Sequence, residues 1–349
     1  MEWTPDEIDK ERPLLQAMAN LKWNEYQQFA PGTRFLESLV KWLQQFETIA
    51  DRKVAYGLVR DHLIFISSEQ LAHLVEILFS EKISPVLIKK TAAEINSSPY
   101  LVTKILNDVA YENNLRTSLF IGLSDGSRID QFRRSAHLNN EQVIGTYEIS
   151  NTKLKDMLEN LQKEVPDSKF RTIFLLDDFT ASGKSYFRDG GKGKLGKVFK
   201  AIFDPSKTDS EGYKASIDYE RIEIHILFYI ATSDALKNIQ DGINQYKKEN
   251  GVNFVAKVDC LLMLDESIKK RITDNQEMME FLKKYFDDDV VDEHYKKGKH
   301  DFPFLGFNEC GLPLVLNHNS PNNSVGILWL PTDMKYRGLF PRISRHKEK

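Results

Sequence analysis

Short apolar runs alternate with segments of helical length from Ser118 onward, and this alternation restricts the available folds more than any other feature. The segments between the runs, such as Asn151–Leu161 and Ser233–Tyr246, are long enough for crossover helices. Strands that alternate with helices predict an α/β domain with a mostly parallel central sheet and right-handed crossovers. Ligands of such sheets bind beyond the carboxyl ends of the strands, so we expect functional residues in the turns after each run. The runs are Leu119–Gly122, Thr172–Leu176, Ile222–Ile230 and Val258–Leu264.

Residues 1 to about 115 follow a different, mostly helical pattern. Apolar residues recur at helical spacing in Phe35–Phe46 and Ser68–Phe79, and Leu63–Ile66 is a short strand candidate. The 349 residues are too many for one minimal domain. We therefore expect a helical N-terminal region over residues 1–115, an α/β domain over residues 116–334 and a basic C-terminal tail over residues 335–349.

Composition is that of an ordinary globular protein, with 41% hydrophobic and 28% charged residues and a formal net charge of −3. This balance excludes a polyanion binder that acts through bulk charge. The two cysteines, Cys260 and Cys310, indicate no disulfide framework and favour a cytoplasmic location. The longest apolar runs have strand length, whereas a membrane-spanning helix needs about 20 apolar residues. We therefore expect no membrane insertion.

The segment Arg171–Ser185 carries the clearest chemistry. An apolar strand ends at two adjacent carboxylates, Asp177 and Asp178, and a turn of small residues leads to an expected helix start. The carboxylates are able to accept hydrogen bonds from vicinal hydroxyls or to hold a divalent cation. Gly183 lets the backbone approach a phosphate closely, and a helix N-terminus would favour the anion electrostatically. The turn residues that we expect to bind the substrate are Thr180, Ala181, Ser182, Gly183, Lys184 and Ser185.

This segment resembles the phosphoribosyl pyrophosphate-binding motif of type I phosphoribosyltransferases, which is an apolar strand, two acidic residues and a small-residue turn with Thr/Ser-Gly. The resemblance implies that Asp177 and Asp178 face the ribose hydroxyls, act in catalysis and hold Mg²⁺, and that residues 180–185 cradle the 5′-phosphate. Purine-salvage members carry an acidic residue in the turn that helps to activate the base, whereas this chain has Ala181 there. Orotate-type members also lack that acid, so the departure argues only against a hypoxanthine-guanine-type mechanism.

Two other interpretations of this segment remain. Residues 182–185 look like the end of a Walker A loop, but that motif needs a glycine where this chain has Asp178. The second interpretation is a buried strand followed by a capped helix, without a functional site. Two adjacent acids are costly to bury without partners, so a binding role is favoured.

Two further loops are candidates for the substrate site. In the family, the first core strand ends in a loop that contacts pyrophosphate, and here that loop is Ser124, Asp125, Gly126, Ser127 and Arg128. The guanidinium of Arg128 would supply charge-assisted hydrogen bonds. Near the C-terminus, three amides would be able to read a base edge. They belong to Asn319, Asn322 and Asn323. The plainer interpretation of residues 124–128 is an exposed turn, and that of the asparagine segment is a polar surface loop.

The segments at residues 122–128, 177–183 and 319–329 also resemble those of phosphoribosyltransferase-like proteins encoded in bacterial conflict and antiphage gene clusters. The resemblance implies a role in nucleotide metabolism during antiphage defence. We expect a pentosyl-transferring enzyme that uses Mg²⁺ with phosphoribosyl pyrophosphate or a ribose-phosphate nucleotide. The alternative is a non-catalytic module that senses a nucleotide and acts on a partner protein through the N-terminal helices.

Two basic segments allow further contacts. Gly190–Lys197 is either a loop that closes over phosphates or an ordinary surface loop. The basic tail, which contains Lys335, Arg337 and Arg342, would contact nucleic acid or an acidic partner. A frayed, solvated terminus is the more common interpretation of such a segment.

Overall fold

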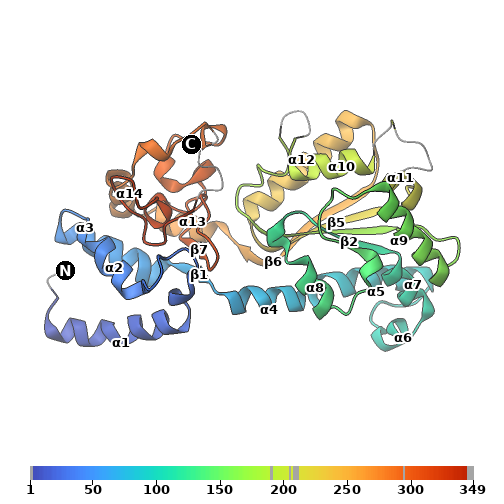
Figure 1. Ribbon diagram of the computed structural model, residues 1–349, viewed down its shortest axis with the longest axis horizontal. Helices are drawn as coiled ribbons and strands as arrows, with labels where there is room; N and C mark the ends of the chain where they lie inside the picture. Colours follow the sequence, from blue (N-terminus) through green and yellow to red (C-terminus); the bar gives the residue numbers. More distant parts are fainter. Residues whose placement is uncertain (1–2, 189–191, 204–205, 207–211, 294, 344–349) are drawn as a thin grey trace. The chain divides into compact units, whose positions relative to one another are not determined.

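The structure is a computed structural model that describes residues 3–188, 192–203, 206, 212–293 and 295–343. The chain forms two compact units: unit 1 comprises Met1–Leu71 and Asp265–Lys349, and unit 2 comprises Ala72–Leu264. The chain passes from unit 1 to unit 2 within α4 (Ser68–Leu78) and returns after β6 (Val255–Leu264) (Figure 1). Each unit has its own hydrophobic core. No helix in the described ranges is long and apolar enough to cross a bilayer.

A five-stranded parallel sheet forms the centre of unit 2, in the order β3-β2-β4-β5-β6. The register aligns Gly122 with Leu176 and Asp177 with Phe228. The α/β class and the parallel sheet expected from the alternating runs are therefore confirmed. The sequence pattern did not indicate β3, because two residues are too few to produce a periodicity. Besides β6, the strands of this sheet are β2 (Ser118–Gly122), β3 (Val143–Ile144), β4 (Thr172–Thr180) and β5 (Glu223–Thr232).

Side chains of β4 alternate between the two faces of this sheet. Ile173 and Leu175 belong to a core that α9 (Asn151–Glu164), α10 (Lys194–Ile202) and α12 (Ser233–Asn250) complete on one face. Phe174 faces the other side and stacks on Phe120 with 5.1 Å between ring centroids. Since β4 continues to Thr180, the carboxylates at positions 177 and 178 lie within the strand and on opposite faces. The expectation that they mark the strand end was wrong.

Several helices of unit 2 begin at local capping residues. The side chains of Asp108, Ser150 and Thr232 accept backbone hydrogen bonds at the starts of α7 (Val109–Arg116), α9 and α12. The helices expected over residues 151–161 and 233–246 are confirmed as α9 and α12. The remaining helices are α5 (Ser84–Glu94), α6 (Val102–Leu106), α7 (Val109–Arg116), α8 (Ile129–Ser135) and α11 (Gly212–Ser216).

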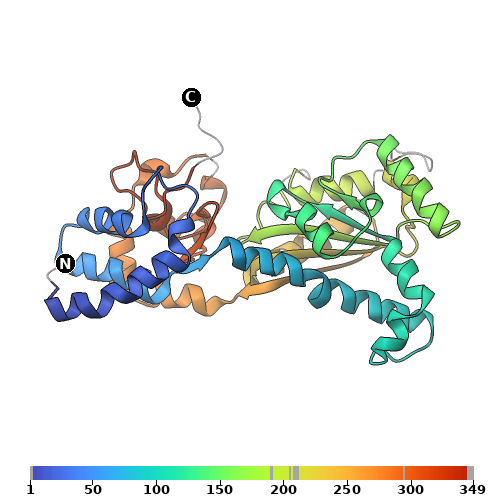
Figure 2. The ribbon, with the colours of Figure 1, turned by 60° about the horizontal axis from the view of Figure 1, so that its bottom comes forward.

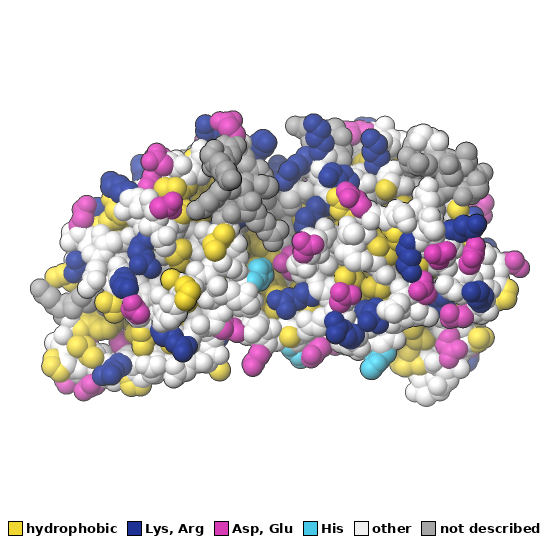
Figure 3. All heavy atoms as spheres, in the orientation of Figure 1, with side chains coloured by type: hydrophobic (Ala, Val, Ile, Leu, Met, Phe, Trp, Pro, Cys, Tyr) yellow, Lys and Arg dark blue, Asp and Glu magenta, His cyan; other side chains and the backbone are white. Residues whose placement is uncertain are grey.

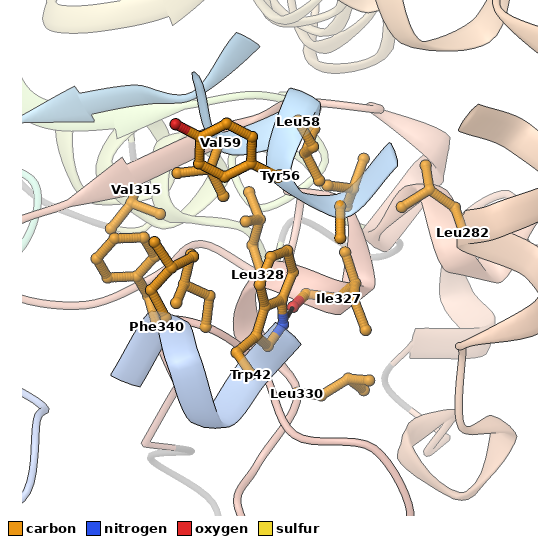
Figure 4. Close-up of a cluster of buried hydrophobic side chains, with 14 of the residues drawn as sticks. Trp42, Tyr56, Leu58, Val59, Leu282, Val315, Ile327, Leu328, Leu330 and Phe340 are labelled. Carbon is orange, nitrogen blue, oxygen red and sulfur yellow. Dashed lines mark hydrogen bonds between the residues drawn. The ribbon is translucent and has the colours of Figure 1, made fainter. Parts of the chain in front are cut away.

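Unit 1 joins segments from both ends of the chain (Figure 2). Their buried side chains form one aromatic-rich core. Within this core, Trp42 Nε1 donates a hydrogen bond to the backbone oxygen of Ile327 at 3.1 Å (Figure 4). Strands β1 (Ile64–Ile66) and β7 (Leu314–Leu316) pair in parallel. The helices are α1 (Pro5–Leu21), α2 (Phe35–Gln44), α3 (Ile49–Gly57), α13 (Glu266–Thr273), α14 (Gln276–Lys284) and α15 (Gly326–Trp329).

The two units cross the boundaries expected from the sequence. Residues 72–115 belong to unit 2, and residues 265–334 belong to unit 1. The tail expected from residue 335 is also not separate in its described part, because Leu339 and Phe340 are fully buried in unit 1 and Phe340 stacks on Phe35. Residues 344–349 lie outside the described residues. A helical pattern shows which side chains turn inward, but not which distant segment they meet.

Candidate functional site

The carboxyl ends of β2 and β4 are neighbours at the point where the order of the strands reverses. From β2 the chain continues to β3 on one side, whereas β4, β5 and β6 follow one another on the other side. Open α/β sheets bind ligands at such a switch point, outside the carboxyl ends of the strands. The segments that meet there are residues 123–128 after β2 and residues 177–186 at the end of β4.

Asp177 is fully buried, and its carboxylate accepts hydrogen bonds from four groups of the protein. Oδ1 accepts from the hydroxyl of Ser124 at 2.5 Å and from the backbone N–H of Asp178 at 3.2 Å. Oδ2 accepts from the hydroxyl of Tyr186 at 2.7 Å and from the ammonium of Lys194 at 2.6 Å. A carboxylate has about four acceptor positions, so the chain's own groups saturate Asp177.

Asp178 lies on the other face of β4 and is partly exposed. Its Oδ1 accepts a hydrogen bond from the backbone N–H of Phe179 at 2.8 Å. Although part of its surface is exposed, protein atoms surround the carboxyl group closely. Desolvation, followed by the charge of Asp177, raises the pKa of Asp178 to about 6, and the charge of Lys194 opposes this shift. The two carboxylates therefore have different surroundings: four protein donors surround that of Asp177, whereas residue Asp178 keeps part of its surface exposed.

The loop after β2 lies against both carboxylates. Ser124 donates to Asp177, and a Cβ atom on Gly126 would lie 2.4 Å from Oδ2 of Asp178. The hydroxyl of Tyr229 donates to the backbone oxygen of Ser127 at 2.8 Å and so fixes the loop from β5. Arg128 is half-buried in a left-handed conformation with φ 48°, and Asp125 is exposed. The structure thus brings this loop to the carboxylates, and its contact with pyrophosphate stays a prediction.

The turn after β4 is fastened to α12. Thr232 donates from its hydroxyl to the backbone oxygen of Ala181 at 2.6 Å, and Asn238 donates to that of Ser182 at 3.0 Å. Gly183 has φ +69°, and a Cβ atom there would lie 2.9 Å from the backbone oxygen of Ala235. Glycine is required at position 183 because of this φ and because of its contact with α12.

Several backbone N–H groups of the turn have no acceptor among the residues that the structure describes. Within the described part of the chain, nothing accepts from the backbone N–H groups of Ser182, Gly183 or Ser185. Ser182 and Gly183 are nevertheless buried. Buried N–H groups are rarely left without a partner, so these three donors favour an anion in this turn. The side chains of Thr180 and Ser182 are also buried, whereas that of Lys184 is exposed.

The helix expected directly after the turn is wrong. Lys184–Tyr186 form a turn, and the next helix in the described residues, α10, begins at Lys194. The backbone oxygens of Ser185 and Tyr186 accept from the N–H groups of Lys194 and Leu195, both at 3.0 Å, and so point to α10 instead of starting a helix of their own. The described residues directly after the turn therefore supply no helix dipole at the phosphate, and they do not form a Walker A loop, which leads straight into a helix.

Sequence reasoning missed four residues that shape the site: Tyr186, Lys194, Thr232 and Asn238. Lys194 lies in the basic run Gly190–Lys197, for which the sequence allows either a loop that closes over phosphates or an ordinary surface loop; residues 189–191 lie outside the described residues. No sequence signal links Lys194 to Asp177, because the contact forms only after α10 folds back onto β4.

The asparagines expected to read a base belong to unit 1. Asn319 Nδ2 donates to the backbone oxygen of Ile343 at 3.2 Å, and Asn323 Nδ2 donates to that of Phe307 at 3.1 Å. The backbone oxygen of Asn322 accepts from the N–H of Phe307 at 2.6 Å. These contacts hold together C-terminal segments of unit 1, and a base-binding role for the three residues stays a prediction.

The donor set at the carboxylate pair does not fit a metal ion held directly by Asp177. Both of its oxygens are taken by protein donors, one of them the cation of Lys194. Across the described ranges, moreover, no group of three or more His, Cys, Asp or Glu side chains is arranged to hold a metal. The expected Mg²⁺ ligation by both carboxylates therefore lacks support from the geometry.

Comparison with known proteins gives one family match. A family model described as PRTase-CE matches residues 39–342, which include most of both units. No curated protein and no solved structure matches the chain. The matched range contains the whole switch point, from Ser124 to Lys194.

Proposed function

The chain belongs to the PRTase-CE family of phosphoribosyltransferase-like proteins, and on this premise we propose that unit 2 binds a ribose 5-phosphate ester. The ester is phosphoribosyl pyrophosphate or a ribose-phosphate nucleotide. The single observation that carries the proposal is the set of N–H donors at Ser182, Gly183 and Ser185, which have no acceptor among the described residues and lie beside a carboxylate pair at the switch point. A turn of this kind suits the dianionic 5′-phosphate.

The neighbouring groups complete a pentose site. Asp178 is partly exposed beside the turn and is suited to accept hydrogen bonds from ribose hydroxyls. The loop Ser124–Arg128 would lie at the leaving pyrophosphate, with the guanidinium of Arg128 as the cationic donor. A transition state with oxocarbenium character would be stabilised by the carboxylate charge and by placement of the reacting groups. The proposed reaction is therefore pentosyl transfer.

The proposal gives no catalytic step to a metal ion. Mg²⁺ was expected on Asp177 and Asp178, but Asp177 is saturated by protein donors. The residues that act on the ligand are therefore the turn N–H groups, Asp178 and Arg128.

Isothermal titration calorimetry tests the proposal. Ribose 5-phosphate and phosphoribosyl pyrophosphate are titrated into wild type, Asp178→Asn and Asp156→Asn, a matched control on the exposed side of α9. We expect binding to wild type and to the control, and binding weakened by about tenfold or more in Asp178→Asn, since a charged hydrogen bond contributes roughly 1.5–3 kcal/mol. Absence of heat with either ligand at millimolar concentration would overturn the proposal.

A second candidate is a nucleotide-sensing module without turnover, which acts on a partner protein through the N-terminal helices. The observation that favours it is that Asp177, one of the two carboxylates expected to act in catalysis, is fully buried and bonded to four groups of the protein. The two candidates differ in product formation. Pyrophosphate release from phosphoribosyl pyrophosphate supports the transferase, whereas binding without any release supports the sensor.

A role in antiphage defence is proposed only from the resemblance to conflict-system proteins. Plaque counts on cells that express wild type or Asp178→Asn test it, with wild type alone expected to reduce plaques. Equal plaque counts for both strains would contradict the role.

Nucleic-acid binding through the basic tail stays a weaker proposal. In the described part of the tail, Lys335 N–H donates to Asp287 Oδ2 at 2.9 Å and Arg337 donates to Ser38 Oγ at 3.3 Å. On the face shown in Figure 3, Lys and Arg side chains are interspersed with Asp and Glu. A salt-dependent shift of DNA mobility would support the proposal, and its absence would dismiss it.

A further inference from the structure

We infer that the ammonium of Lys194 takes the place of a divalent cation at Asp177, so that ligand binding in unit 2 does not need Mg²⁺ on that carboxylate. The inference rests on the proposed function, because it concerns the same site. It assigns Lys194 and Asp177 to positioning and leaves Asp178 as the carboxylate of the pair that meets the ligand.

The position of Lys194 is defined by more than the ion pair. Its Nζ lies 2.6 Å from Asp177 Oδ2, and its backbone N–H donates to the oxygen of Ser185 at 3.0 Å. The ammonium also lies 5.3 Å from the centroid of the Tyr186 ring. The Lys194 side chain is 32% exposed, whereas that of Asp177 is 0% exposed. The ammonium of Lys194 therefore belongs to a partly exposed side chain, whereas the carboxylate that it pairs with is buried.

The surroundings of Asp177 leave no position for a second cation. Ser124 and the backbone of Asp178 occupy Oδ1, and Tyr186 and Lys194 occupy Oδ2. A metal ion would have to displace Lys194 and break a charge-assisted hydrogen bond in a buried site. The displaced contact is among the strongest that a side chain makes.

The four donors also explain what Asp177 does. Ser124 belongs to the loop after β2, Tyr186 to the turn after β4, and Lys194 to α10. One buried carboxylate thus ties three chain segments to β4. Its charge is compensated within the protein, as a buried carboxylate requires. Lys194 acts on both carboxylates, since its charge also opposes the raised pKa of Asp178.

The test uses ribose 5-phosphate as the probe, because it lacks the pyrophosphate that itself binds Mg²⁺. Calorimetry measures its affinity in EDTA and in excess MgCl₂ for wild type, Lys194→Met and Asp177→Asn/Lys194→Met. Lys197→Met is the matched control, since Lys197 is exposed on the same helix. The double variant replaces the ion pair by a neutral pair and keeps the buried carboxylate from being left without a cation.

For wild type and the control, we expect affinities in EDTA and in Mg²⁺ that agree within about threefold. Lys194→Met should bind at least about tenfold more weakly in EDTA and recover in Mg²⁺, because the freed carboxylate then takes the metal. The affinity of the double variant for ribose 5-phosphate should not change when Mg²⁺ is added. Wild-type binding that strengthens by about tenfold or more on adding Mg²⁺ would overturn the inference.

A second measurement separates this inference from the proposed function. Electron paramagnetic resonance of Mn²⁺ counts metal bound to the protein without any sugar phosphate. We expect Lys194→Met to bind Mn²⁺, and we expect wild type and the double variant not to bind it. Equal binding of Mn²⁺ by all three proteins contradicts the inference. If circular dichroism shows that Lys194→Met does not fold, wild type is compared with the double variant alone. The inference is then contradicted if wild type binds Mn²⁺ and the double variant does not. Failure of ribose 5-phosphate to bind under every condition counts against the proposed function alone.

Discussion

Gly126 and Asp178 are in direct contact across the switch point: a Cβ atom on Gly126 would lie 2.4 Å from Asp178 Oδ2. No real Cβ atom approaches a carboxylate oxygen that closely, so any side chain at position 126 forces the loop or the carboxylate to move. The contact thus couples the loop after β2 to the end of β4. The closeness of these two segments is what the sequence-based hypothesis required.

Gly126→Ala tests this coupling. We expect ribose 5-phosphate affinity to fall roughly ten- to hundredfold, since misplacement of site groups by about 1 Å has effects of this size. Gly145→Ala is the control, because nothing lies within 4 Å of a Cβ atom there. Calorimetry on both variants checks the expectation, and equal affinities would show that the loop has no part in binding.

Thr232→Val tests the fastening of the turn to α12. The Thr232 hydroxyl accepts from the N–H of Ala235 at 3.0 Å, as the helix cap, and donates to the oxygen of Ala181 at 2.6 Å. Loss of the cap costs about 1 kcal/mol, and leaving a buried acceptor without a donor costs about 1–3 kcal/mol more. Urea denaturation measures the change in unfolding free energy. Thr232→Ser is the control, because it keeps the hydroxyl. If it loses as much unfolding free energy as Thr232→Val, the two hydrogen bonds are not the cause of the loss.

The pKa of Asp178 predicts a pH dependence of stability. Its value of about 6 in the folded protein lies above the usual 3.8, so the folded state binds the proton more tightly than the unfolded state. The stabilisation from this group is complete below 3.8 and is lost as pH rises through about 6. Asp178→Asn should therefore gain thermal stability relative to wild type as pH rises across that window. A difference in melting temperature that stays constant with pH would contradict this.

Phe340→Ala tests whether the C-terminal segment belongs to the core of unit 1. Phe340 is fully buried and its ring lies 5.7 Å from that of Phe35. Truncation of a buried phenylalanine costs about 3–5 kcal/mol. Chemical denaturation checks the loss, with Val40→Ala as control, because Val40 is 54% exposed on α2. If Phe340→Ala loses no more unfolding free energy than the control, the segment is a solvated tail and not part of the core.

The elements of unit 2 were largely predictable because their signals are local. Apolar runs of strand length marked β2, β4, β5 and β6, and the segments of helical length between the runs marked α9 and α12. The family resemblance also rested on a local motif, Asp177–Gly183. These features follow from the order of residues over a dozen positions, which is what a sequence pattern records.

The remaining features depend on contacts between distant segments. Phe35 meets Phe340 in unit 1, and no periodicity indicates that the two ends of the chain share a core. The helix expected after Ser185 was wrong because the oxygens of Ser185 and Tyr186 bind α10 instead. The opposite faces of Asp177 and Asp178 follow from the continuation of β4 to Thr180, which an acidic pair does not signal.

The central claim is that the turn after β4 binds a phosphate through its own N–H groups. The most direct measurement is a ¹⁵N–¹H chemical-shift titration of the whole chain with ribose 5-phosphate. We expect the largest shifts at the amides of Ser182, Gly183 and Ser185, and little change at Gly145. Binding that leaves those three amides unshifted while others move would place the ligand elsewhere and contradict the account.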